Sequence, residues 1–140
     1  MADERVIATK LEQIEQYHGE LVAKRSTITR ERLHSNTTEQ RAIERMFENV
    51  IQSCADLAKH IASRDFGFDG TRPKEAIRVL EREGVLQEET AETMIEAVGF
   101  RNVLAHQYGS IDYDLVYDQL ESGLNVFDEF SKQVANWHRT

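Results

Sequence analysis

The chain has 140 residues, a formal net charge of −8 at pH 7, 40% hydrophobic residues, 30% charged residues, one proline and one cysteine. This composition is typical of a globular protein with little room for disordered linkers, so we expect one domain over residues 1–140. A single cysteine excludes an internal disulfide, and no apolar run approaches the roughly 20 residues that span a bilayer. No N-terminal stretch reads as a signal peptide, so the sequence predicts a cytoplasmic protein with no membrane partner.

The charge is unevenly distributed along the chain. Residues 1–64 hold ten basic and ten acidic side chains, whereas residues 65–140 hold seven basic and fifteen acidic ones. Nonspecific affinity for nucleic acid comes from clustered Lys and Arg, so this balance argues against a general nucleic-acid-coating protein. An enzyme with this charge that acts on RNA would need a local basic pocket, on one chain or shared between subunits, or would act on RNA that another molecule presents.

Apolar residues recur at helical spacing in the first half of the chain. Over about Asp3 to Arg32 the pattern predicts one long amphipathic helix, although Gly19 and the Ser26-Thr27 pair leave room for a kink or an early end. N-cap residues in the segment 35–38 precede a second periodic run that should end near Arg64. We expect these two helices to form an antiparallel hairpin. Cys54 lies in the second apolar stripe, which predicts a buried, inert thiol.

The second half continues as helices. A loop that contains Pro73 leads to a short helix over 74–83, which Gly84 ends. A fourth helix is predicted from Glu88 to His106, with glutamates in its first turn, and a fifth from about Asp112 to Trp137. No stretch alternates like a strand. The sequence thus predicts an all-α antiparallel helical bundle of four long helices and one short helix.

The candidate site lies at the end of the fourth predicted helix, in the segment 99–109. Arg101 keeps its charge at any working pH and suits a phosphate, and His106 has an unperturbed pKa near neutrality. Asn102 and His106 are four residues apart and share a face, whereas Arg101 lies about 140° around the helix axis from His106. A substrate that reaches both would sit at the helix end, where Gly109 lets the backbone turn and Tyr108 can cover the site.

Cleavage of RNA without a metal needs a base, an acid and positive charge on the phosphorane oxygens. One histidine and one arginine supply only two of these three groups, so two copies of the pair across a twofold interface would complete the site. This shortage predicts a homodimer. The five histidines show no metal-ligand spacing and no Gly-rich phosphate loop is present, so we expect neither a metal nor a cofactor on this chain.

These residues also have an ordinary structural interpretation. A histidine in the last turn of a helix interacts favourably with the helix dipole, Arg101 could pair with an acid such as Asp112, and Tyr108 could pack on the core. Gly99, in the middle of the helix, costs about 1 kcal/mol relative to alanine. Close approach of another helix or of a substrate would explain it, and so would a tolerated defect.

The motif resembles a known signature. Phe100, Arg101, Asn102, His106 and Tyr108, followed by Ile111-Asp112, are similar to the Arg-x4-His-x-Tyr signature of HepT-like toxins in the HEPN superfamily. The similarity extends to the order of the helices and covers most of the chain, including Ala55-Asp56-Leu57-Ala58, Pro73, Leu80 and Gly84-Val85-Leu86.

The resemblance implies a toxin of a toxin-antitoxin system, a metal-independent endoribonuclease that dimerises so that two Arg-His pairs line one cleft. Arg101 would stabilise the phosphate, His106 would act as acid and base, and Asn102 would support them. The implied partner is a minimal nucleotidyltransferase antitoxin, a second polypeptide that binds this chain in a hetero-oligomer and silences it by transferring AMP from ATP to Tyr108. Two other interpretations remain: a non-catalytic helical module that binds a nucleotide or RNA, and a purely structural adaptor.

Overall fold

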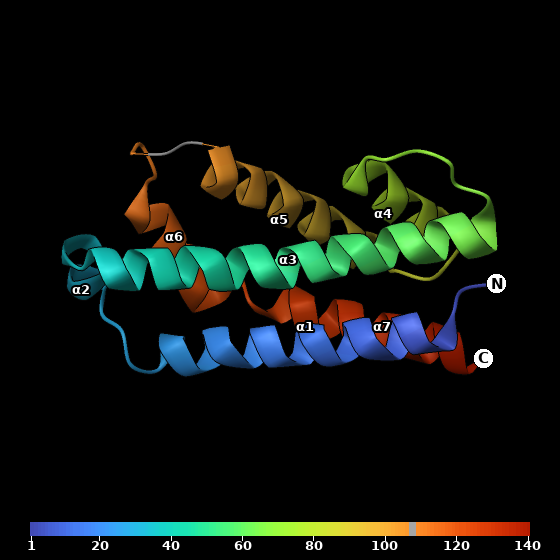
Figure 1. The fold of residues 1–140 in the computed structure, drawn as a ribbon, viewed down its shortest axis with the longest axis horizontal. Coiled ribbons are helices and arrows are strands. Elements are labelled where there is room, and N and C mark those ends of the chain that lie inside the picture. Colours follow the sequence, from blue (N-terminus) through green and yellow to red (C-terminus); the bar gives the residue numbers. More distant parts are fainter. Residues whose placement is uncertain (107–108) are drawn as a thin grey trace.

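A computed structural model, which describes residues 1–106 and 109–140, gives a bundle of helices with no strand in those ranges. The helices are α1 (Glu4–Arg25), α2 (Arg30–Ser35), α3 (Thr37–Phe66), α4 (Pro73–Arg82), α5 (Glu88–His106), α6 (Tyr113–Ser122) and α7 (Asn125–Arg139) (Figure 1). The predicted all-α antiparallel bundle is confirmed. The predicted number of helices is wrong, because the described part of the chain has seven helices rather than five.

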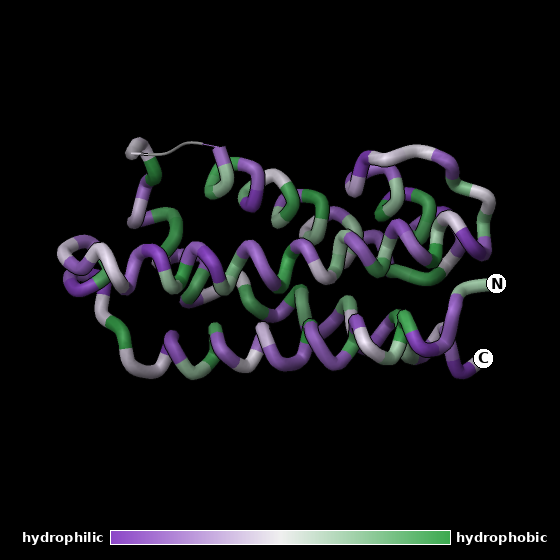
Figure 2. The backbone as a smooth tube through the Cα atoms, viewed as in Figure 1, coloured by the Kyte–Doolittle hydropathy of each residue, from purple (hydrophilic) through white to green (hydrophobic). Residues whose placement is uncertain are grey.

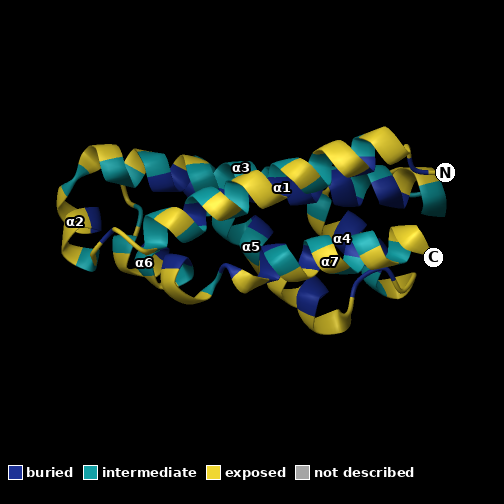
Figure 3. Cartoon of the chain, turned by 90° about the horizontal axis from the view of Figure 1, so that it is seen from below, coloured by how far each residue is buried: buried dark blue, intermediate teal, exposed yellow. Residues whose placement is uncertain are grey.

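The longest helix, α3, forms the centre of the bundle. It contacts α1, α4, α5 and α7, with α1 and α7 on one side and α4 and α5 on the other (Figure 1). The helices α1 and α3 run antiparallel, as predicted. In the view from below, exposed residues alternate with buried ones along α1 and α7 (Figure 3). No helix in the described ranges is both long and apolar enough to cross a membrane.

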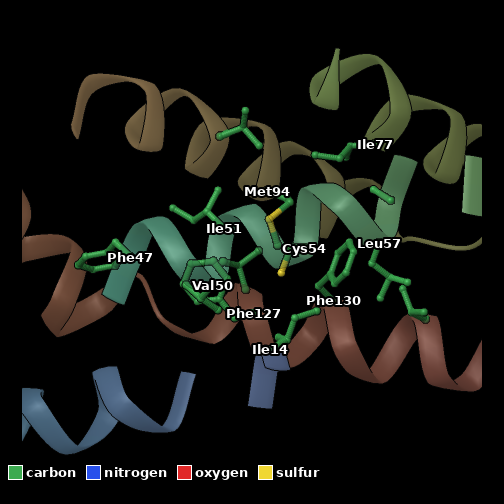
Figure 4. Packing of buried hydrophobic residues seen from close by; sticks show 14 of the residues in the cluster. Ile14, Phe47, Val50, Ile51, Cys54, Leu57, Ile77, Met94, Phe127 and Phe130 are labelled. Carbon is green, nitrogen blue, oxygen red and sulfur yellow. The ribbon is translucent and has the colours of Figure 1, made fainter. Parts of the chain in front are cut away.

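One cluster of buried apolar side chains draws residues from all seven helices. Hydrophobic and hydrophilic residues alternate along the long helices, so each helix can turn one face to its neighbours (Figure 2). Around Cys54, side chains from four helices meet, among them Ile14, Met94 and Phe130 (Figure 4). Cys54 is fully buried, and burial raises the pKa of its thiol, which fits the predicted inert thiol.

The first predicted helix is wrong beyond Arg25. The hydroxyl of Ser26 donates to the carbonyl of Ala23 at 2.7 Å, and that of Thr27 donates to the carbonyl of Lys24 at 3.2 Å, which satisfies the last carbonyls of α1. Thr29 then caps the short helix α2 by accepting from the amide of Arg32 at 3.1 Å. The early end considered from the sequence therefore occurs at Ser26-Thr27, whereas the helix continues through Gly19.

The last predicted helix is also divided. The segment 112–137 forms α6 and α7, with a break at Gly123-Leu124. The hydroxyl of Ser122 donates to the carbonyl of Asp118, and Gly123 lies so close to Gln119 that a Cβ there would meet the Gln119 carbonyl oxygen at 2.8 Å. These local contacts end α6 although the apolar pattern continues through the break.

The other three predicted helices agree with the structure. Asn36 caps α3 by accepting from the amide of Glu39, and α3 ends at Phe66, two residues beyond the predicted end. Helix α4 ends before Gly84, which is left-handed as predicted, with a φ of 79°. Helix α5 has the predicted bounds, Glu88–His106.

Candidate active site at the end of helix α5

Helix α5 carries the candidate residues and packs against α3, α4 and α7. Its buried residues are Thr90, Ala91, Met94, Val98 and Leu104. Phe100 packs edge-on against Phe47 of α3, with ring centroids 5.2 Å apart. These contacts fix the rotation of α5 about its axis, and this rotation determines how far each candidate residue is exposed.

Arg101 occupies a position at which the helical pattern expects an apolar residue. It follows Met94 and Val98 at i+7 and i+3, so it lies on the buried stripe of α5. The side chain is partly buried, and its Nε is buried with no hydrogen-bond partner in the described ranges. Its Nη1 lies 3.5 Å from Oδ1 of Asn102. A buried guanidinium nitrogen without a partner costs free energy, so this position favours an anionic ligand.

No carboxylate offsets the charge of Arg101 within 4.0 Å in residues 1–106 and 109–140. The structural interpretation had suggested Asp112 as a partner. Asp112 instead caps α6, where its Oδ1 accepts from the amides of Asp114 at 3.0 Å and Leu115 at 3.3 Å. That element of the structural interpretation is therefore wrong.

Asn102 and His106 are exposed on another face of α5. They are four residues apart, so they are neighbours on that face, with His106 in the last turn of the helix. Across the described ranges, no hydrogen bond joins His106 to Arg101 or Asn102. The structure thus brings Arg101 and Asn102 together, and it leaves His106 open to solvent at the same helix end.

Tyr108, the predicted AMP acceptor, lies outside the described residues. The description resumes at Gly109, whose φ of 78° is in the left-handed region that favours glycine. The backbone turns here, as predicted, and Asp112 then begins α6.

A polar network that the sequence analysis did not find holds the start of α6 against α3. The hydroxyl of Tyr113 donates to Oε2 of Glu44 at 2.6 Å, and Arg41 donates to both residues, at 2.9 Å to Glu44 and 3.0 Å to Tyr113. Glu44 is 8% exposed. Partial burial and then the hydrogen bond to Glu44 raise the pKa of Tyr113. The only signal in the sequence was an acidic residue, Glu44, beside the apolar stripe of its helix.

The described residues offer no metal centre, because no group of three or more His, Cys, Asp or Glu side chains in those ranges could hold an ion. At the end of α5, the fixed cation of Arg101 can bind an anion and the exposed imidazole of His106 can transfer a proton.

These features define a helical bundle that has, at the end of one helix, an arginine without a carboxylate partner among the described residues and an exposed histidine. Residues 7–134 match the family model described as "Ribonuclease HepT-like". The chain belongs to the HepT-like ribonuclease family.

Individual relatives agree with this assignment. The chain is 26% identical over 132 residues to the tRNA nuclease HepT of Aphanizomenon flos-aquae, an alignment that covers 94% of this chain and 89% of the relative. A tri-AMPylated HEPN toxin of Shewanella oneidensis, solved in complex with an MNT antitoxin, superposes with a TM-score of 0.86 at 16% identity, covering 96% of this chain and 99% of that one. YutE from Bacillus subtilis, a cytosolic protein of unknown function, gives a TM-score of 0.76 at 17% identity, covering 98% and 92%. The two solved structures support the fold.

Proposed function

We propose that this protein is the toxin of a toxin-antitoxin pair and that it cleaves RNA without a metal, using Arg101 and His106. The observation that carries the proposal is the environment of Arg101, a partly buried cation with an unpartnered Nε and no carboxylate within 4.0 Å in the described ranges. A phosphodiester at this helix end would offset the charge of the guanidinium. Membership of the HepT-like family and the named tRNA nuclease relative support RNA as the source of that phosphate.

The reaction requires two proton transfers. A neutral imidazole takes the proton of the ribose 2′-hydroxyl, the 2′-oxygen attacks phosphorus, and the bond from phosphorus to the 5′-oxygen breaks as a second group donates a proton to that oxygen. Arg101 would stabilise the charge on the phosphorane oxygens, and Asn102 would orient the guanidinium. Because one chain supplies one imidazole at this site, we propose a homodimer in which two Arg101-His106 pairs line one cleft.

The proposal is tested with Arg101→Ala and His106→Ala, measured by single-turnover cleavage of labelled RNA in EDTA at pH 7. We expect losses of about 100-fold or more for His106→Ala and about 100- to 1000-fold for Arg101→Ala. Arg82→Ala and His138→Ala are matched controls, because both side chains are exposed and lie outside α5. Circular dichroism verifies that each variant folds.

Undiminished cleavage by the folded Arg101→Ala and His106→Ala variants would refute the assignment. A wild-type protein that binds RNA but does not cleave it at any pH would instead identify a binding module, with the same two residues as ligand contacts.

We further propose that a nucleotidyltransferase antitoxin silences the protein by transferring AMP to Tyr108. An adenylyl group two residues from His106 adds a negative charge and a bulky base, which would block the cleft and compete for Arg101. The AMPylated toxin in complex with an MNT antitoxin among the structural neighbours supports this regulation. Intact mass after coexpression with a minimal nucleotidyltransferase antitoxin should rise by whole adenylyl units, and Tyr108→Phe should abolish the first of them. An unchanged mass would contradict the proposal.

A further inference from the structure

Lys74 lies against α5 close to the candidate site. It is the second residue of α4 and its side chain is exposed. Its Nζ lies 3.6 Å from the point where a Cβ on Gly99 would stand. The ammonium group thus lies beside the surface of α5 at Gly99, at the distance of an ordinary contact.

The ammonium group lies on the face that His106 occupies. Gly99, Asn102 and His106 are spaced at i, i+3 and i+7, so they line one side of α5. With a rise of 1.5 Å per residue, positions 99 and 106 are about 10 Å apart along the axis. A short stretch of single-stranded RNA can bridge this distance. Lys74, Asn102 and His106 thus form a polar row along one face of α5.

Lys74 is one of the few cations in the acidic half of the chain that form no ion pair with another described residue. Residues 65–140 hold seven basic side chains, of which Arg78, Arg82 and Lys132 form ion pairs with carboxylates. Arg139 bonds to Asn136. Arg72, Lys74, Arg101 and Arg139 have no carboxylate within 4.0 Å in the described ranges, although acids outnumber bases fifteen to seven in this half. Two of these four cations lie at α5: Lys74 meets it at Gly99, at the start of the polar row, and Arg101 lies on another face of the same helix.

We infer that Lys74 binds a phosphate of the RNA strand that neighbours the scissile phosphate. The inference rests on the proposed ribonuclease function. It assigns Lys74 a substrate-binding role that steers and aligns the strand along α5 toward Arg101 and His106. In a chain with a net charge of −8, such a local contact gives the RNA a defined path.

The test measures RNA binding in a His106→Ala background, which removes turnover. Lys74→Gln is compared with Lys132→Gln, which removes the same charge from an exposed lysine on α7. We expect Lys74→Gln to weaken binding about 5- to 10-fold at low salt and to reduce the slope of log Kd against log salt by about 0.7, the value for one phosphate contact on single-stranded nucleic acid. Lys74→Arg should retain the binding of the parent protein.

Equal affinities and salt slopes for Lys74→Gln and Lys132→Gln would overturn the inference, and the proposed function would stand if the His106-containing protein still cleaves RNA in EDTA. A Lys74→Gln variant that binds RNA normally but loses affinity for the nucleotidyltransferase partner would assign Lys74 to a protein interface instead. A protein with His106 intact that neither binds nor cleaves RNA would overturn the inference together with the function on which it rests.

Discussion

At the scale of single residues, the network of Glu44, Tyr113 and Arg41 is the contact that ties the chain after the motif to α3. We predict that Tyr113→Phe lowers the free energy of unfolding by about 1–3 kcal/mol, because it removes a hydrogen bond to a buried carboxylate. Chemical denaturation measures this effect. Tyr17→Phe is the control, since the Tyr17 hydroxyl makes no hydrogen bond in the described ranges.

The coupling between Tyr113 and Glu44 can be measured in a double-mutant cycle with Glu44→Gln. We expect the effects of the two substitutions to be non-additive, because each removes the same hydrogen bond. Strict additivity would contradict the account of this network.

Gly99 is either a tolerated helix defect or a position at which a side chain would meet the substrate. The neighbour of an added Cβ would be Lys74 Nζ at 3.6 Å, an ordinary contact, so close packing within this chain does not require a glycine here. Gly99→Ala and Gly19→Ala should each raise the free energy of unfolding by up to about 1 kcal/mol, because alanine favours a helix interior. We expect Gly99→Ala alone to weaken RNA cleavage. If both variants are stabilised and cleave RNA equally well, Gly99 is a tolerated defect.

Contacts between residues of different helices could not be predicted from the sequence. Arg101, Asn102 and His106 were found because they lie within six residues of one another in a single helix. Glu44 and Tyr113 are 69 residues apart, and Lys74 and Gly99 are on different helices. Helical periodicity predicts which side of a helix is buried, but it does not predict which residues of two helices come opposite each other.

At the scale of elements, α6 is held to α2 by exposed ion pairs. Arg30 donates to Asp114 and to Asp118, each at 2.8 Å, and lies over the ring of Tyr117 at 4.6 Å. His34 lies 2.9 Å from Asp114. The hydrogen bond with His34, and then that with Arg30, lowers the pKa of Asp114. These contacts fix α6, the helix that follows the motif.

The lowered pKa of Asp114 determines how the stabilisation of α6 by its contacts with α2 depends on pH. A carboxyl group whose folded pKa lies below its unfolded value of about 3.9 stabilises the fold above that value and loses its effect as the pH falls through the folded pKa. We predict that Asp114→Asn speeds hydrogen exchange of the α6 amides at pH 7, and that its difference in stability from wild type shrinks below about pH 4. Asp128→Asn, whose ion pair lies within α7, is the control. A difference that grows as the pH falls below about 4 would contradict this account.

The elements themselves were largely predictable. Helix α5 has the predicted bounds because its first-turn glutamates and the turn at Gly109 mark its ends in the sequence. The breaks at Ser26-Thr27 and at Gly123 interrupt apolar patterns that continue on both sides. Periodicity alone joins such helices, and the back-bonded hydroxyls that separate them are visible only in the structure.

At the scale of the whole molecule, the proposed dimer is tested by mixing subunits. An Arg101→Ala homodimer would have no guanidinium at the cleft, and a His106→Ala homodimer would have no imidazole. A heterodimer of the two variants keeps one of each. If the pairs share one cleft, the mixed dimer holds a guanidinium and an imidazole together, which neither homodimer does. Mixing should then recover a small part of the cleavage activity, although the second imidazole is still missing. Heterodimers that form, as native mass spectrometry would verify, but stay inactive would contradict a shared cleft.

The most direct test of the account identifies the ends of the RNA products made in EDTA. Attack by the 2′-oxygen with departure of the 5′-oxygen leaves a 2′,3′-cyclic phosphate, or the monophosphate from its hydrolysis, on one fragment and a 5′-hydroxyl on the other. Mass spectrometry of the fragments should find these ends with the wild-type protein and not with His106→Ala. Products that carry a 3′-hydroxyl and a 5′-phosphate, or cleavage that stops in EDTA, would contradict metal-independent cleavage by Arg101 and His106.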